Sequence, residues 1–180
     1  MGMFFNVELN SLDDLLMLEL NDLYDAEKRL CDALPQMAEA ATSPALRQAF
    51  QEHAKQTQRQ VSRLEQIFVE LGKPASRETC EAMKGLIKEG TEVIKATGNN
   101  DVKDAALISA AQRVEHYETA GYGSARTFAQ HLGHANVVRL LQSTLDEEKE
   151  TDARLTQLAE ASINIKAETA TGVGGGSWGS

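Results

Sequence analysis

The sequence predicts an all-α protein built around an antiparallel four-helix bundle. Four long stretches carry apolar residues at the three- and four-residue spacing of one helix face. Capping residues, glycines and prolines mark where most of these stretches begin or end. Short turns join the first stretch to the second and the third to the fourth, whereas a long link separates the two pairs. Each pair is therefore expected to form a hairpin, and the link to cross to the other end of the bundle.

The first helix is expected to begin after Ser11, which stands three residues before Asp14 as an N-terminal cap should. Glu27 is the only polar member of its core-facing stripe, so this helix carries a buried acid. Pro35 is expected to kink or end the regular part, with a short continuation towards Ala41. The stripe comprises Leu16, Leu20, Leu23, Glu27, Leu30 and Leu34.

The second helix is expected between Ser43-Pro44, a cap followed by a proline in the first turn, and the glycine stop at Gly72. His53 lies near the centre of its stripe, and Gln56 falls towards the edge. The stripe comprises Leu46, Phe50, His53, Thr57, Gln60, Leu64, Phe68 and Leu71.

The long link, residues 75–100, has a weaker pattern. Met83 and Ile94 are among the apolar residues that suggest a short extra helix there. Gly85 and Gly90 are expected to interrupt or soften this helix. A link of this length is more than a tight turn and favours a crossover.

The third helix places two acids where its core face should be. It is expected to be capped by Asp101, with Asp104 three residues on, and to run to about residue 131 before Gly133 stops it. At 3.6 residues per turn, Glu115 and Glu118 fall on the apolar stripe. Their neighbours on that stripe are Ala111, Tyr122 and Ala125.

The fourth helix follows almost at once and again carries acids at the centre of its stripe. These are Glu148 and Asp152, and their companions are Leu141, Leu145, Leu155 and Ala159. Beyond Ile165 the chain turns polar and glycine-rich, which is typical of a flexible tail. We therefore expect a lead at 1–10, the bundle at 11–165 and a tail at 166–180.

Composition limits the classes of function. A chain of 180 residues with 42% hydrophobic residues can bury one sizeable core. Its net charge of -9 repels phosphate backbones and argues against nucleic acid as a partner. Cys31 and Cys80 are too few for a disulfide framework. No signal peptide, myristoylation pattern or run of about 20 apolar residues is present, so we expect a cytoplasmic protein without a membrane span.

The buried acids and the histidine are expected to meet at one level of the bundle. Counted from the two short turns, they lie about 10 to 18 residues along their helices, depths that agree to within roughly two turns. Carboxylates and an imidazole from four facing helices are the ligands that hold a pair of iron or manganese ions in a bundle core. The sequence predicts a metal centre at Glu27, His53, Gln56, Glu115, Glu118, Glu148 and Asp152.

A metal-free polar network is the alternative. A single buried acid or histidine is more often a hydrogen-bonded core residue than a metal ligand. Here five acids and one histidine lie on four stripes that hold no lysine or arginine, so several of the acids would have to stay protonated if no cation were bound. His53 is the residue whose surroundings best distinguish the two interpretations.

Four other polar residues are interpreted without a metal. His116 lies off the stripe and is expected at the surface or an interface. His131 and His134 flank a turn, where capping is the simpler role. The Tyr122 hydroxyl is within reach of a ligand carboxylate or a redox role, although plain packing is the simpler interpretation.

Several segments together resemble the YciE/YciF group of ferritin-like bacterial stress proteins. The resemblance covers nearly everything between Ser11 and Ile163. The segments that carry it are Leu23-Tyr24-Asp25-Ala26-Glu27-Lys28-Arg29-Leu30, His53 with Thr57, Cys80-Glu81-Ala82-Met83-Lys84-Gly85-Leu86-Ile87, Asp104-Ala105-Ala106-Leu107-Ile108 leading into Val114-Glu115-His116-Tyr117-Glu118, and Glu147-Glu148 with Asp152.

The resemblance implies a ferritin-like fold, a homodimer and a part in a bacterial stress response. Carried over residue by residue, it supports Glu27, His53, Glu115, Glu118, Glu148 and Asp152 as the metal centre. Our first hypothesis for the function is a dinuclear non-haem centre that binds metal and reacts with oxygen or peroxide. Relatives in this group carry glutamate where this chain has Gln56. Because a neutral amide is a poorer ligand for a hard cation, the departure lowers the expected occupancy of a second ion. A metal-free homodimer that acts through a protein partner stays open as the alternative function.

Overall fold

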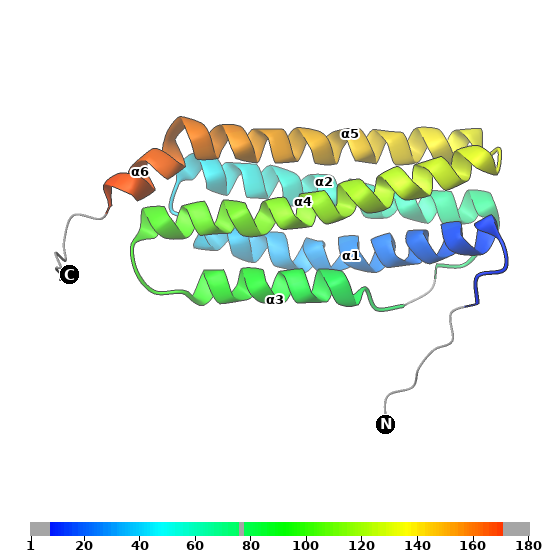
Figure 1. The fold of residues 1–180 in the computed structure, drawn as a ribbon, viewed down its shortest axis with the longest axis horizontal. Helices are drawn as coiled ribbons and strands as arrows, with labels where there is room; N and C mark the ends of the chain where they lie inside the picture. The colour runs from blue at the N-terminus through cyan, green and yellow to red at the C-terminus, as the bar shows by residue number, and fades with distance from the viewer. Residues whose placement is uncertain (1–7, 76–77, 171–180) are drawn as a thin grey trace, which may run out of the picture.

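The chain folds into an all-helical structure in which four long helices lie alongside one another (Figure 1). The computed structural model describes residues 8–75 and 78–170, and these contain no strand. Helices α1, α2, α4 and α5 are the long ones, and the shorter α3 packs against α1 and α4. The predicted all-α class is confirmed. Within the described part of the chain, no helix combines the length and the apolar character that a membrane span requires.

Helix α1, Leu12–Ala40, begins directly after Ser11, as the capping pattern predicted. The Ser11 side chain accepts a hydrogen bond from the backbone N–H of Asp14 at 3.1 Å. Pro35 does not end the helix, which continues for five more residues. Met37 and Ala38, beyond the proline, are buried, so packing against the core holds the last turn in place.

Helix α2, Pro44–Leu71, also matches the expected limits. The Ser43 side chain accepts from the backbone N–H of Leu46. Gly72 ends the helix in the left-handed conformation, at φ 63°, which glycine adopts without steric cost.

Helix α3, Glu81–Lys95, confirms the extra helix expected in the link and is continuous, so of the two effects expected from the glycines, interruption does not occur. Gly85 and Gly90 both lie inside it. The Cys80 thiol caps its first turn by accepting from the backbone N–H of Met83 at 3.3 Å. Met83 is fully buried among residues of the neighbouring helices, and this tertiary packing offsets the low helix propensity of glycine.

Helix α4, Asn100–His131, is capped by Asn99 and not by Asp101 as predicted. The Asn99 side chain accepts from the backbone N–H groups of Asp101 and Val102. Asp104 has a different role: it is only 2% exposed and turns towards the α1–α2 connection. The predicted stop is confirmed, because Gly133 follows the helix at φ 80°.

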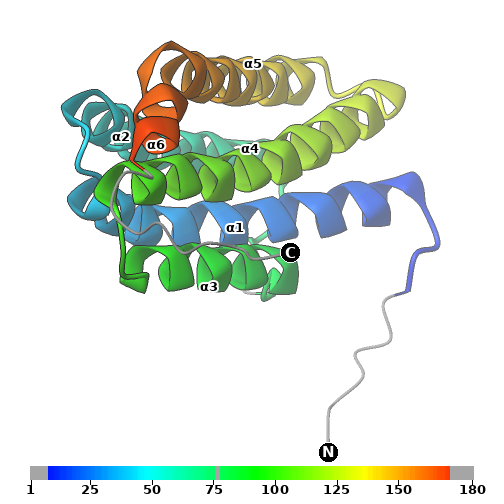
Figure 2. The same cartoon turned by 60° about the vertical axis from the view of Figure 1, so that its left-hand side comes forward.

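Helix α5, Ala135–Leu158, passes into a π-helical turn, Ala159–Ile163, and then into α6, Asn164–Thr169. Figure 2 shows α6 turning away from the line of α5 across the end of α4, which it contacts. Helical structure thus extends past Ile165, where the polar tail was expected to begin. Ile163 is buried in the core and anchors this segment. Most of the tail predicted at 166–180, and residues 1–7 of the predicted lead, lie outside the described residues.

The apolar core consists of two separate clusters. One contains Leu30, Leu34, Phe50, Leu107, Ala111 and Leu155 among others. The second contains Leu16, Leu20, Leu23, Leu64, Tyr122 and Leu141 among others. On α4 and α5, buried glutamates stand between residues of the two clusters, whereas Glu27 on α1 and His53 on α2 are flanked by residues of the first cluster close to where it ends. A polar layer thus divides the core across its width.

Helices α1 and α4 approach one another closely at Gly121. A Cβ atom at this position would lie 2.8 Å from Cδ2 of Leu23, closer than such atoms normally come. Glycine at position 121 therefore permits the close approach of the two helices. Gly123 has open space where its Cβ would be, so no such contact constrains that position.

Candidate metal centre

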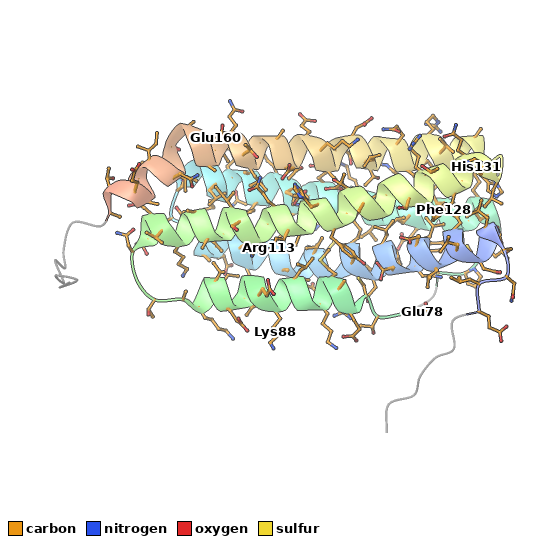
Figure 3. All side chains as sticks on the ribbon, in the orientation of Figure 1. Glu78, Lys88, Arg113, Phe128, His131 and Glu160 are labelled. Atoms are coloured by element: carbon orange, nitrogen blue, oxygen red, sulfur yellow. The ribbon has the colours of Figure 1, made fainter. Side chains whose placement is uncertain are left out.

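Five side chains on the four long helices form the polar layer, and none is more than 4% exposed. They are Glu27 on α1, His53 on α2, Glu115 and Glu118 on α4, and Glu148 on α5. Lys88 and Arg113, by contrast, lie on the outside of the molecule (Figure 3). Glu115 and Glu118 share a face of α4 because they are three residues apart.

Four of these residues are close enough together to bind one ion. One donor atom each from His53, Glu115, Glu118 and Glu148 lies within 4.8 Å of the others. In an octahedral shell with bonds of about 2.1 Å, adjacent donors are about 3.0 Å apart and opposite donors about 4.2 Å apart. The upper limit of 4.8 Å is about 0.6 Å longer than the distance between opposite donors, so small side-chain movements would bring the four donors onto one ion.

The hydrogen bonding of these residues is incomplete. Nε2 of His53 lies 3.1 Å from Oε1 of Glu115, but the two atoms are not oriented as a hydrogen bond. Both ring nitrogens of His53 and both carboxylate oxygens of Glu115 and of Glu118 are buried without a hydrogen-bond partner. Buried polar atoms are normally paired, so this geometry fits a cation better than a closed hydrogen-bond network.

Glu27 stands beside the four residues. Its Oε1 accepts a hydrogen bond from the Tyr122 hydroxyl, and its Oε2 has no partner. The charge of Glu27 acts on the pKa of His53 and of Glu118, so its carboxylate is near both. Glu27 is therefore the carboxylate of the polar layer that lies outside the group of four donors.

Burial makes negative charge costly in this layer when no cation is bound. Desolvation raises the pKa of Glu27 to about 8. Desolvation, together with the neighbouring carboxylates, raises the pKa of Glu118 and of Glu148 well above its ordinary value. Burial opposes the charge of the His53 imidazole, but the Glu115 carboxylate outweighs it and raises the pKa of His53. Near neutral pH the metal-free layer therefore holds protons that a cation would displace.

Three polar side chains beside the layer hold it in place. Nε2 of Gln60 donates to Oε1 of Glu148 and, at 3.1 Å, to Oε2 of Glu147. The Arg63 guanidinium binds both oxygens of Glu147 at 2.9 Å. Sequence reasoning assigned no role to Arg63, although it lies one turn beyond Gln60 and its charge lowers the pKa of Glu27 to a small extent.

Two further residues predicted as ligands, Gln56 and Asp152, are less deeply buried than the five side chains of the polar layer. Gln56 is half-buried and lines a pocket between α2 and α5. Oδ1 of Asp152 accepts a hydrogen bond from Gln112 at 3.1 Å, and its Oδ2 lies 3.4 Å from Nε2 of His116. The short aspartate side chain is 27% exposed and is already paired at the edge of the layer. The interpretation of His116 as a surface residue is confirmed, since its side chain is 72% exposed.

Replacing Tyr122 with phenylalanine is expected to lower the free energy of unfolding by about 1–2 kcal/mol, because Oε1 of buried Glu27 loses its donor. Urea unfolding in the presence of a chelator measures this loss without a contribution from metal. Tyr24→Phe is the matched control, since its hydroxyl binds Glu65 at an exposed site and its loss should cost less than about 0.5 kcal/mol. Equal losses in the two variants would contradict a specific role for the Tyr122 hydroxyl.

Comparison with known proteins places the chain in a family. The family described as "Domain of unknown function (DUF892)" matches residues 11–168. The chain is 45% identical over 163 residues to Protein YciF of Escherichia coli (strain K12), covering 90% of this chain and 98% of that protein.

Two solved structures resemble most of the chain. The crystal structure of the E. coli stress protein YciF aligns with a TM-score of 0.84 at 44% identity, over 87% of this chain and 99% of that one. YcfI from Rhodopseudomonas palustris aligns with a TM-score of 0.81 at 42% identity, over 85% of this chain and 98% of that one. The chain is therefore a member of the DUF892 family, as its resemblance to the YciE/YciF group predicted.

Proposed function

We propose that this chain is a ferritin-like protein that binds iron or manganese in its polar layer and acts in a bacterial stress response. The observation that carries the proposal is the group of donors from His53, Glu115, Glu118 and Glu148, which lie within 4.8 Å of one another and in which most side-chain polar atoms have no hydrogen-bond partner. The description of E. coli YciF as a stress protein supports the biological context.

The ligand roles follow from the chemistry of the donors. Oxygen and imidazole donors suit iron and manganese, and His53 supplies the single nitrogen. Glu115, Glu118 and Glu148 supply the charge that neutralises a divalent ion, and Glu27 adds the carboxylate that a second ion would need. Iron or manganese bound here would supply one-electron chemistry towards oxygen or peroxide.

The surrounding residues prepare the site for such an ion. The Tyr122 hydroxyl fixes the orientation of Glu27, and the Gln60 amide fixes that of Glu148. The two apolar clusters on either side of the layer keep bulk water away from the donors. Preorganised ligands with their own hydrogen-bond supports bind metal more tightly than ligands free to rotate.

Metal content per chain tests the proposal. Protein produced with iron and manganese available is expected to hold one to two equivalents by mass spectrometry, and the His53→Ala/Glu115→Ala variant close to none. His131→Ala/Glu150→Ala removes the same residue types from exposed positions and should keep the wild-type content. Wild-type protein that stays free of metal after anaerobic reconstitution with iron(II) would rule the centre out.

The second candidate is a metal-free homodimer that acts through a protein partner. The structure of R. palustris YcfI, whose description proposes a structural role, favours this alternative. In that case the buried acids would remain protonated. Stability would then be indifferent to iron and manganese, since only a ligand that binds the native state stabilises it. The homodimer itself stays a prediction under both candidates.

A further inference from the structure

A small pocket lies between α2 and α5 at the level of the polar layer. Its volume is about 30 Å³, enough for one or two water-sized particles. Phe50, His53 and Leu155 form part of its lining, and Gln56 and Arg154 contribute polar groups. The helices on either side, α2 and α5, contact one another less extensively than each contacts its own hairpin partner.

His53 belongs both to this pocket and to the candidate metal cluster. Its side chain is only 4% exposed, and neither ring nitrogen has a hydrogen-bond partner. A particle in the pocket therefore meets an imidazole that is also a donor of the cluster. A second cavity of the same size, lined by Leu30 and Leu86 between α1 and α3, is apolar and includes no residue of the cluster.

An ion pair between α2 and α5 borders the pocket. Nη1 of Arg154 binds Oε2 of Glu52, and both residues line the pocket. Both side chains are nearly half exposed, and exposed pairs of this kind are weak and open readily.

We propose that this pocket is the route by which a divalent cation reaches the polar layer, with Glu52 as the outer carboxylate that receives it and His53 as the first inner ligand. The inference rests on the proposed metal centre. A hydrated cation that approaches the pocket meets an accessible carboxylate, which replaces part of its water shell. Arg154 opposes this step in two ways, because it occupies Glu52 and because its positive charge repels the cation.

The two partners of the ion pair should therefore have opposite effects on metal uptake. Arg154→Gln frees Glu52 and removes a positive charge, so anaerobic uptake of iron(II) is expected to be about threefold to tenfold faster at low ionic strength. Glu52→Gln removes the receiving carboxylate and leaves Arg154 unpaired, so uptake is expected to be slower by a similar factor. A chromogenic chelator that captures only unbound iron(II) at timed intervals measures both rates.

Arg113→Gln and Glu89→Gln are the matched controls. These residues form an exposed ion pair between α4 and α3, and neither lines the pocket. They change the net charge by the same amounts. They should leave the rate of uptake within about twofold of wild type, because screening weakens the effect of charges that do not line the pocket. The effects of the Arg154 and Glu52 variants should shrink when the ionic strength rises from about 0.01 M to about 1 M.

The final iron content separates the access route from the centre itself. All five proteins are expected to reach the same content, because the ligands in the polar layer are unchanged. Equal rates in wild type and both pocket variants would overturn the access route while leaving the centre intact. Faster uptake in both pocket variants would also overturn it. That result would show that either substitution loosens the contact between α2 and α5 and that the sign of the removed charge does not matter. Wild-type protein that takes up no iron(II) would overturn the centre and the route together.

Discussion

Manganese(II) at about one hundred times its dissociation constant is expected to raise the melting temperature of this chain by about 5–11 °C. The physical reason is mass action: an ion held by donors from α2, α4 and α5 cannot bind the unfolded chain in the same way. Binding then adds about 2.7 kcal/mol to the free energy of unfolding, which in a chain of this length corresponds to the stated shift. Thermal unfolding followed by the circular dichroism of the helices measures it.

The Glu115→Gln/Glu118→Gln variant is expected to lose this response. Its amides keep the shape of the side chains but cannot supply the negative charge that a divalent ion requires. Without metal the variant should melt no lower than wild type, because neutral groups replace acids that are costly to ionise in the core. Glu92→Gln/Glu150→Gln, which changes two exposed acids, should respond to manganese as wild type does. If manganese leaves the melting temperature of the wild-type protein unchanged, the metal-free alternative is favoured.

The size of the manganese effect should depend on pH. Burial raises the pKa of Glu27 from 4.5 to about 8, so between these values the folded chain keeps a proton that the unfolded chain has released. The metal-free fold therefore becomes less stable as pH rises through this range. A cation that takes the place of the proton removes the penalty, and the gain from manganese should be larger at about pH 8 than at about pH 5.5. The same gain at both pH values would contradict carboxylate ligation.

Replacing Asp104 with alanine is expected to lower the free energy of unfolding by about 2–4 kcal/mol. One carboxylate accepts three hydrogen bonds from the α1–α2 connection: from the backbone N–H and the hydroxyl of Thr42, at 2.9 and 2.8 Å, and from the backbone N–H of Ser43, at 2.7 Å. Asp104 is 2% exposed, so alanine leaves these donors facing a gap at the junction of three helices. Urea unfolding with a chelator present gives the loss.

Thr42→Ala is the matched control for this prediction. It removes one of the three donors and leaves both backbone bonds, so it should cost only about 1 kcal/mol. The loss for Asp104→Asn should lie between those for Asp104→Ala and Thr42→Ala. Its amide oxygen can still accept a hydrogen bond, but its NH₂ group faces other donors. A loss below about 1 kcal/mol for Asp104→Ala would show that water replaces the carboxylate at this junction.

Much of the fold could be predicted because its helices are local features. Ser11, Ser43, Gly72 and Gly133 mark helix ends by the chemistry of capping and of positive φ, which the sequence displays directly. Asn99 was missed because Asp101, two residues on, fits the same capping pattern. The continuity of α3 depends on packing against α1 and α4, and a pattern read along one helix does not contain that information.

The site was predictable in part for a related reason. Glu27, His53, Glu115, Glu118 and Glu148 stand at the centres of their stripes, so helical periodicity places them inside. Asp152 satisfies the same periodicity but contacts Gln112 and His116 instead. These contacts depend on side-chain length and on the packing of α4 against α5, which periodicity does not show. Arg63 was missed because a long side chain can reach inward from a position beside the stripe.

The polar layer has a consequence for how the helices choose their alignment. A leucine-lined bundle tolerates sliding of one helix past another, since one apolar layer is much like the next. Here a slip of one turn, about 5.4 Å, would set a carboxylate or the imidazole against leucine and separate it from its partners. The acids and His53 therefore favour a single register of the four helices, because every other register separates them from one another. This preference would hold before any ion is bound.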